Sequence, residues 1–126
     1  MKKFILTSFT LLFLSISVNA SNTNEVLPKD DKKTELSTFC KMIRLGNYQI
    51  VKALMNNGTN INRKSLGLTP VMYAARYNET EILKLLIANG AKLHTKSDKG
   101  YTAIQYAIMS KANKAHEVLE AAFQKK

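Results

Sequence analysis

The sequence is poor in the residues that build disulfide frameworks and metal centres. Its 126 residues include one cysteine, two histidines and no tryptophan. A single cysteine cannot form an internal disulfide or a zinc site made of several cysteines. We therefore expect Cys40 to be buried, because a free cysteine behaves as a small apolar side chain; a disulfide to a second chain is the alternative.

Glycine, proline and acidic residues are also scarce. The five glycines and two prolines are too few for a collagen-like or low-complexity chain, and the hydrophobic share of 45% is ordinary for a globular protein. Nine acidic residues stand against nineteen lysines and arginines, which gives a formal net charge of +10. The length suits one domain at most, so the composition indicates one basic globular domain.

The common motifs of catalysis and nucleotide binding are missing. The chain has no G-x-S-x-G, G-x-x-x-x-G-K-[ST] or H-E-x-x-H sequence and no dinucleotide-binding glycine pattern. His94 and His116 stand apart, without cysteines or paired carboxylates at ligand spacing. Glu117 follows His116 directly, and adjacent positions of a helix do not face each other. The sequence therefore predicts no enzymatic activity, no metal site and no cofactor.

The first twenty residues have the three-part pattern of a secretory signal peptide. Lys2 and Lys3 give a positive start, residues 4–18 are uncharged and mostly apolar, and small residues lead up to Ala20. We predict cleavage between Ala20 and Ser21 and export to the bacterial periplasm or the cell exterior. A membrane anchor is the alternative, but a spanning helix needs about 20 apolar residues, and this run is shorter and contains five hydroxyl residues.

A polar segment and then an internal repeat follow the predicted signal peptide. Residues 21–34 have no apolar period and are predicted to form a flexible tether. Beyond them, Gly67-Leu68-Thr69-Pro70 recurs 33 residues later as Gly100-Tyr101-Thr102-Ala103. A repeat of this length predicts an array of similar units that bury their core against one another. The expected repeat domain covers residues 35–126, divided into the units 35–66, 67–99 and 100–126.

The middle unit predicts two short helices joined by a tight turn. Thr69-Pro70 is a typical helix start, and Asn78 suits the left-handed conformation that a turn between helices requires. The strongly apolar stretch from Ile82 to Ile87 predicts a second helix that ends at Asn89-Gly90. Across the three units we expect helices near residues 37–45, 48–56, 69–77, 80–89, 102–110 and 113–122.

This arrangement resembles the ankyrin repeat family, and the resemblance covers nearly all of residues 35–126. It implies an all-α solenoid of three helix-turn-helix repeats with projecting turns. The residues that carry the resemblance in the middle unit are Gly67, Thr69, Pro70, Ala74, Ala75, Glu81, Ile82, Leu85, Leu86, Asn89, Gly90 and Ala91.

The chain departs from the family pattern in two respects. Cys40, Met72 and Gln105 stand where the family usually has histidine, so the hydrogen bond that this histidine supplies is expected to be lost in all three units. The segment after Gly58 is one residue shorter than the segment after Gly90. The outer units match less well than the middle one, as expected of units that cap an array.

The resemblance also implies where a partner would bind. Ankyrin repeats generally bind partners on the concave surface formed by the projecting turns and the first helix of each pair. At the matching positions of this chain, the exposed candidates are Arg44, Leu45, Arg63, Lys64, Leu66, Leu68, Arg76, Tyr77, Lys96, Asp98, Lys99, Tyr101, Met109 and Ser110.

The candidate set is strongly basic, with six bases and one acid. By contrast, the second helices and their first turns are expected to hold the acids Glu79, Glu81, Glu117 and Glu120. The binding side is therefore predicted to be positively charged. Tyr73 and Tyr106 are expected to pack at least partly between helices instead of binding a partner.

These expectations favour an exported, non-catalytic module that binds an acidic protein partner through the basic concave face. An inhibitor or immunity-type role is one form of this function, by analogy at the level of the fold. The alternative is electrostatic attachment to an anionic polymer or to a membrane surface, without spanning the membrane. Nucleic acid is disfavoured because no motif that reads it is present. We expect a monomer.

Overall fold

Six α-helices make up the described part of the molecule. The computed structural model describes residues 35–125; the predicted signal peptide (1–20) and tether (21–34) lie outside these residues. No strand occurs among residues 35–125, where the only pairing of strand type is an isolated bridge between Ser65 and Leu68. The helices are α1 (Thr38–Arg44), α2 (Tyr48–Asn56), α3 (Pro70–Arg76), α4 (Thr80–Ala88), α5 (Ala103–Met109) and α6 (Asn113–Gln124).

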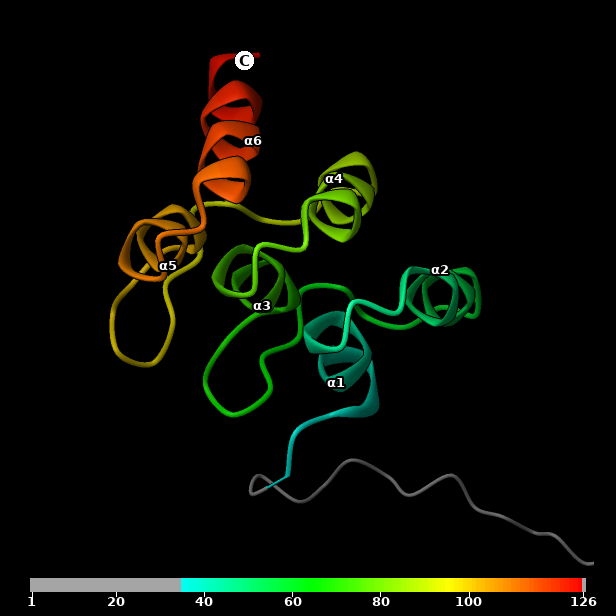
Figure 1. The fold of residues 1–126 in the computed structure, drawn as a ribbon. Coiled ribbons are helices and arrows are strands. Elements are labelled where there is room, and N and C mark those ends of the chain that lie inside the picture. The colour runs from blue at the N-terminus through cyan, green and yellow to red at the C-terminus, as the bar shows by residue number, and fades with distance from the viewer. Residues whose placement is uncertain (1–34, 126) are drawn as a thin grey trace, which may run out of the picture. The chain divides into compact units, whose positions relative to one another are not determined.

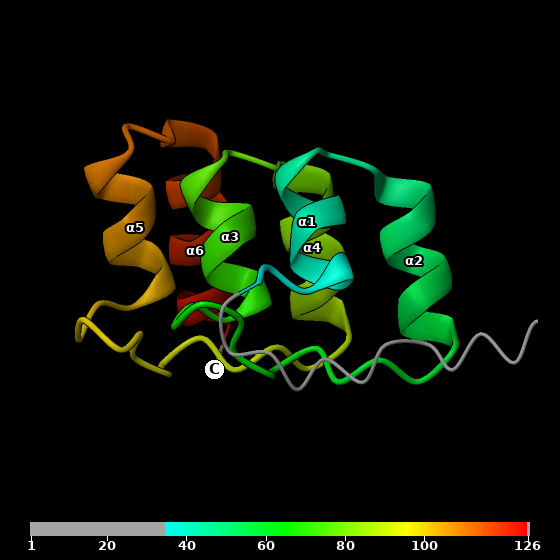
Figure 2. The same ribbon diagram turned by 90° about the horizontal axis from the view of Figure 1, so that it is seen from below.

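The helices form pairs that stack in two layers. The first helices of the pairs, α1, α3 and α5, lie side by side in one layer, and the second helices, α2, α4 and α6, form the other (Figures 1 and 2). α3 contacts α1 on one side and α5 on the other, and it also packs on its own partner, α4. The predicted all-α solenoid of three helix pairs is confirmed, and the expected helix ends agree with the structure to within two residues.

The same turn joins the two helices of every pair. Its central residue has a positive φ each time: Gly46 at 73°, Asn78 at 56° and Lys111 at 56°. The next residue donates its N–H to a carbonyl five positions back, as Asn47 does to Met42 over 2.9 Å. This is the Schellman ending of a helix. The conformation predicted for Asn78 is confirmed.

Asparagine side chains connect neighbouring repeats. The Asn78 Oδ1 accepts the N–H of Ala115 at 3.0 Å, in the first turn of α6, so the second repeat supplies a cap for a helix of the third. The Asn62 Oδ1 accepts the N–H of Lys92 at 2.9 Å, between the loops that follow α2 and α4. These bonds fix the offset between successive units.

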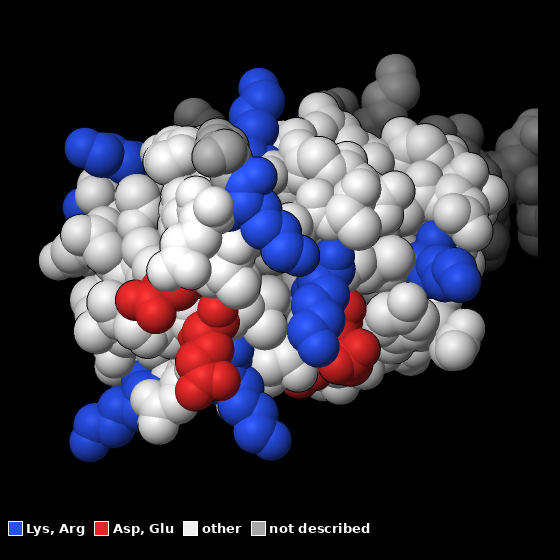
Figure 3. All heavy atoms as spheres, turned by 90° about the horizontal axis from the view of Figure 1, so that it is seen from above, with Lys and Arg blue, Asp and Glu red and all other residues white. Residues whose placement is uncertain are grey.

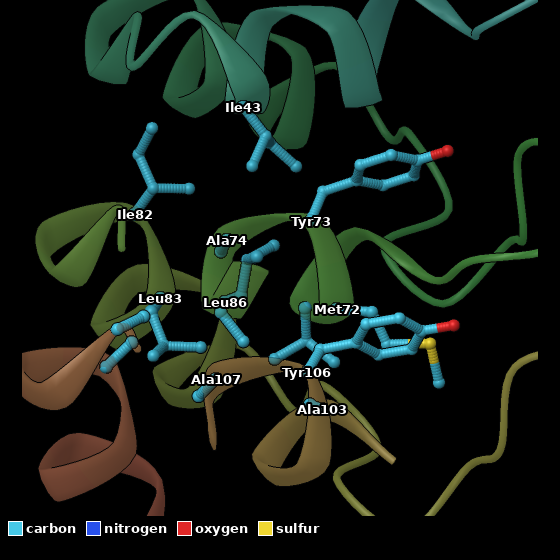
Figure 4. Close-up of a cluster of buried hydrophobic side chains, with 14 of the residues drawn as sticks. Ile43, Met72, Tyr73, Ala74, Ile82, Leu83, Leu86, Ala103, Tyr106 and Ala107 are labelled. Carbon is cyan, nitrogen blue, oxygen red and sulfur yellow. The ribbon is translucent and has the colours of Figure 1, made fainter. Parts of the chain in front are cut away.

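The core lies between the two layers and centres on α3. Every residue from Pro70 to Ala75 is buried. The alanines of α3 and α5 leave room for neighbouring helices, and Ile82, Leu83 and Leu86 of α4 fill the space behind them (Figure 4). Cys40 is 1% exposed, which confirms its expected burial.

The hairpin turns before α3 and α5 differ by one residue. In the first, Leu66 (φ 51°) and Gly67 (φ 83°) form a two-residue turn between Ser65 and Leu68. This is a type I′ conformation, which requires positive φ at both central residues. In the second hairpin, three residues lie between Ser97 and Tyr101, whose carbonyl accepts the Ser97 N–H at 2.8 Å. The shorter segment noted in the sequence is therefore the shorter hairpin.

Two buried tyrosines hold these hairpins against the first helices. The Tyr73 hydroxyl donates to the Ser65 carbonyl at 2.7 Å, and the Tyr106 hydroxyl donates to the Ser97 Oγ at 2.9 Å. Their rings point in the same direction from α3 and α5 (Figure 4). The expected packing of both tyrosines is confirmed.

The expected loss of a hydrogen bond at the three histidine positions is wrong for the third repeat. There the Gln105 Oε1 accepts both the N–H and the hydroxyl of Thr102, at 2.8 and 3.2 Å, so glutamine replaces histidine as the acceptor. In the second repeat the Met72 sulfur accepts the Thr69 N–H at 3.3 Å. The Thr69 hydroxyl is buried and has no hydrogen-bond partner among the described residues. Gln105 therefore accepts a hydrogen bond from the threonine hydroxyl in the third repeat, whereas Met72 does not do so in the second.

Replacement of Asn78 separates its two structural roles. Asn78→Gly keeps the positive φ and removes the bond to Ala115, and should lower the free energy of unfolding by about 1 kcal/mol. Asn78→Ala also removes the side chain that lets asparagine tolerate the left-handed conformation, for a total loss of about 2–3 kcal/mol. Urea unfolding followed by circular dichroism measures both. An alanine variant as stable as the wild type would contradict both roles.

Tyr73 should make the fold sensitive to alkali. Burial raises its pKa from about 10 to about 12. Above pH 10 the unfolded chain therefore loses this proton first, so the stabilisation is complete below pH 10 and decreases as the pH rises toward 12. Tyr73→Phe should weaken this pH dependence in unfolding curves, with exposed Tyr77→Phe as the control. The same alkaline loss in Tyr73→Phe would contradict the assignment.

Candidate functional site

The candidate binding residues at the helix ends form a row. Arg44, Arg76 and Met109 are the last residues of α1, α3 and α5, and these helices lie next to one another. Leu45 and Tyr77 directly follow α1 and α3, and both side chains are exposed. Equivalent positions of successive repeats thus bring residues far apart in sequence to one edge of the first-helix layer.

The candidates from the hairpin turns are tied together across repeats. The Lys64 Nζ lies 3.2 Å from the Asp98 carboxylate, and the Asp98 N–H donates to the Gly67 carbonyl at 3.0 Å. A Cβ at position 67 would lie 2.9 Å from that carboxylate, so glycine leaves the space that Asp98 occupies. The Ser37 N–H donates to the Ser65 Oγ at 2.8 Å, which ties the start of α1 to the first hairpin.

We call the surface made by these turns and helix ends the basic face. It comprises the predicted residues Arg44, Leu45, Arg63, Lys64, Leu66, Leu68, Arg76, Tyr77, Lys96, Asp98, Lys99, Tyr101, Met109 and Ser110.

A hollow of about 320 Å³ lies on the basic face between α3 and α5. Six of its lining residues belong to the predicted set and come from four separate segments of the chain. The seventh, Tyr106, was expected to pack at least partly between helices; it is buried and also lines the hollow. The full lining is Leu68, Arg76, Lys99, Tyr101, Tyr106, Met109 and Ser110.

The other candidates of the basic face do not line this hollow. Arg44 and Leu45 belong to the first repeat, and Arg63, Lys64 and Leu66 to the first hairpin. Beside the hollow, the Arg76 guanidinium carbon lies 5.8 Å from the centroid of the Tyr77 ring, a cation–π contact. The predicted set is therefore broader than the lining of this hollow.

Among the described residues, charge is distributed unequally between the basic face and the second-helix layer. The basic face has six bases and one acid, and that acid is paired with Lys64. The second-helix layer shows acidic and basic side chains together (Figure 3). Its pairs include Glu81 with Lys84 at 3.4 Å and His116 with Glu120 at 3.3 Å. The second-helix layer thus balances its own charge, whereas the basic face keeps a positive excess.

Exposed apolar side chains gather on the basic face as well. Of the seven large hydrophobic residues exposed in the described part of the chain, five belong to the predicted set: Leu45, Leu66, Tyr77, Tyr101 and Met109. These side chains are therefore exposed among the bases of the same surface.

Sequence reasoning missed the other two exposed hydrophobic residues, Ile50 and Ile108. Ile108 is 57% exposed, although the equivalent residues of the earlier repeats, Ile43 and Ala75, are fully buried. It occupies the position on which the first helix of a following repeat would pack. Ile50, at the other end of the stack, corresponds in the same way to buried Ile82. An alignment of the repeats could have revealed both residues, because they belong to outer units and match positions that are buried in the middle unit.

The described residues contain no cluster of side chains suited to a metal ion. No three of the His, Cys, Asp and Glu side chains between residues 35 and 125 are grouped so that they could hold a metal ion. His116 pairs with Glu120 one turn along α6, not with its neighbour Glu117. A search of the same residues finds no helix with the length and apolar character needed to cross a membrane.

Comparison with curated proteins finds similarity over the repeat region. The chain is 39% identical over 75 residues to Ankyrin repeat, SAM and basic leucine zipper domain-containing protein 1 of Carollia perspicillata. It is 37% identical over 75 residues to the protein of that name from Homo sapiens and 36% identical over 74 residues to that from Mus musculus. The matches cover 58–59% of this chain and 15% of each relative.

The match to a protein family covers the helices described above. The family described as "Ankyrin repeats (3 copies)" matches residues 39–125, from the first turn of α1 to the end of α6. Repeats of this family indicate a protein–protein interaction module, which is typically non-catalytic. With three stacked helix pairs, the hairpin turns between them and this match along most of its length, the chain belongs to the ankyrin repeat family.

Proposed function

We propose that this chain is a non-catalytic interaction module that binds an acidic protein partner through its basic face. The observation that carries the proposal is the combination of six bases with five exposed apolar or aromatic side chains on one surface. Arginine and tyrosine are enriched among the residues that dominate binding energy. A positive surface also steers an acidic partner toward the correct side.

Three bases of the basic face are available for a partner. Arg44, Arg76 and Lys99 form no salt bridge with a described residue. An acidic side chain that approached them would not have to displace an internal carboxylate. Removal of an existing ion pair would otherwise reduce the gain from a new one.

The alternative is attachment to an anionic polymer or a membrane surface, which the net charge of +10 favours. Such binding depends mainly on charge, whereas the basic face also exposes Leu45, Leu66 and Met109. Apolar side chains at these positions support a protein partner with its own apolar surface. Within this proposal we include an inhibitor or immunity-type role, in which the stack of repeats would close the cleft of an exported enzyme.

Export belongs to the same proposal, and it rests on residues 1–20 of the sequence. Expression of the full chain in a bacterium should yield a protein whose first residue is Ser21, found in the periplasm or the medium. N-terminal sequencing after cell fractionation measures both features. Retention in the cytoplasm with residues 1–20 intact would contradict export, and it would leave the assignment of the basic face unaffected.

Charge reversal on the basic face, compared with charge reversal on the second-helix layer, tests the assignment of the partner-binding surface. The triple variant Arg44→Glu, Arg76→Glu and Lys96→Glu should lose the protein that the wild-type chain captures from extracts, because each new carboxylate repels an acidic surface. The matched control is Lys52→Glu, Lys84→Glu and Lys114→Glu, which makes the same change of charge on the second-helix layer. It should capture the partner as the wild type does.

Two outcomes would contradict the proposal. Equal capture by both triple variants would mean that the partner does not bind the basic face. Complete release of every bound molecule in 1 M salt would favour the purely electrostatic alternative, because the screening length falls from about 10 Å at 0.1 M to about 3 Å at 1 M. Circular dichroism of each variant shows that the helices remain.

A further inference from the structure

The hollow between α3 and α5 has a cationic group at each end. Lys99 precedes α5 in the second hairpin turn, whereas Arg76 is the last residue of α3. The two helices are neighbours with seven residues each. A helix rises about 1.5 Å per residue, so about 10 Å separates the hairpins from the ends of the helices, and residues at both places line the hollow.

The middle of the hollow is apolar. The Tyr106 hydroxyl is engaged with Ser97, so its ring faces the hollow without a free polar group. The Tyr101 ring meets it edge to face, with 5.8 Å between centroids. Leu68 adds apolar surface at the hairpin end of the hollow, and Met109 adds it at the other end, next to Ser110.

We infer that this hollow binds a segment of the partner in which an apolar side chain stands between two acidic residues. The inference rests on the proposed function and specifies the chemistry of its partner. The apolar side chain would cover Tyr106 and displace water from the hollow, and the carboxylates would pair with Arg76 and Lys99. An extended chain advances about 3.3 Å per residue, so acidic residues three positions apart match the length of about 10 Å.

The form of the hollow favours a protein side chain over an enclosed small ligand. Arg76, Lys99, Tyr101, Met109 and Ser110 are exposed, so the hollow is open along its length. Sites for small ligands usually bury most of the ligand surface. A polyanion would meet the two cations, but it would leave the apolar centre without a matching group.

Three capped peptides test the inference in a titration of the full chain, labelled with ¹⁵N and followed by NMR. The peptide Gly-Asp-Leu-Ser-Asp-Gly should shift the amide signals of Lys99, Tyr101, Met109 and Ser110 in a saturable manner. The peptides Gly-Asp-Ala-Ser-Asp-Gly and Gly-Asn-Leu-Ser-Asn-Gly should each bind at least about tenfold more weakly, because one lacks the apolar contact and the other lacks the charge.

A pair of variants at adjacent positions gives the matched control. Met109→Glu places a carboxylate in the hollow and should abolish binding of the Asp-Leu-Ser-Asp peptide. Ile108→Glu makes the same change at the neighbouring residue, which is 57% exposed and does not line the hollow, and should leave binding unchanged. Amide spectra of both free variants report whether the fold is kept.

The results separate this inference from the proposed function. Equal affinity for the leucine and alanine peptides, shifts confined to other residues, or no saturable shift at all would overturn the assignment of the hollow. Loss of the captured partner in the basic-face triple variant would still support the proposed function in that case. If the triple variant also keeps its partner, both proposals are wrong.

Discussion

The packing of α3 between α1 and α5 is the contact on which the described fold depends. α3 has seven residues, too few for a stable helix in isolation. Its alanines are fully buried, and its neighbours are the equivalent helices of the other repeats. Because a single helix pair cannot cover its own apolar surface, the repeats stabilise one another. The hollow lies between α3 and α5, so this packing also sets its width.

Polar contacts between repeats position the basic face on this stack. Asn78 caps α6, and the hydrogen bond from the Asp98 N–H to Gly67 joins the two hairpins. Tyr73 and Tyr106 then hold the hairpins against α3 and α5. Each contact involves a buried group or a backbone amide, so it constrains geometry more strongly than an exposed ion pair would. The charged side chains of the turns are thereby presented by a backbone that is fixed at both ends.

The sequence could predict what repeats in every unit. The helix pairs, the positive φ of Asn78 and the burial of Tyr73 depend on local propensity and on register, and both are visible in the residues. The exposure of Ile108 depends on the absence of a following helix among the described residues, which an apolar pattern alone does not reveal. The Gln105 contact was missed for another reason. A family pattern gives the residue type at a position, whereas the Thr102 amide needs only an acceptor within reach, and the Gln105 Oε1 provides one.

The fold alone does not account for leucine at position 66. Its φ of 51° places it in the left-handed region, where a type I′ turn favours asparagine or glycine. A Cβ-bearing residue there costs about 1–2 kcal/mol, and a side chain that is 50% exposed recovers little of this by burial. Neither backbone preference nor packing therefore explains leucine at this position. In the proposed function, contact with a partner on the basic face would give the Leu66 side chain a role that folding does not.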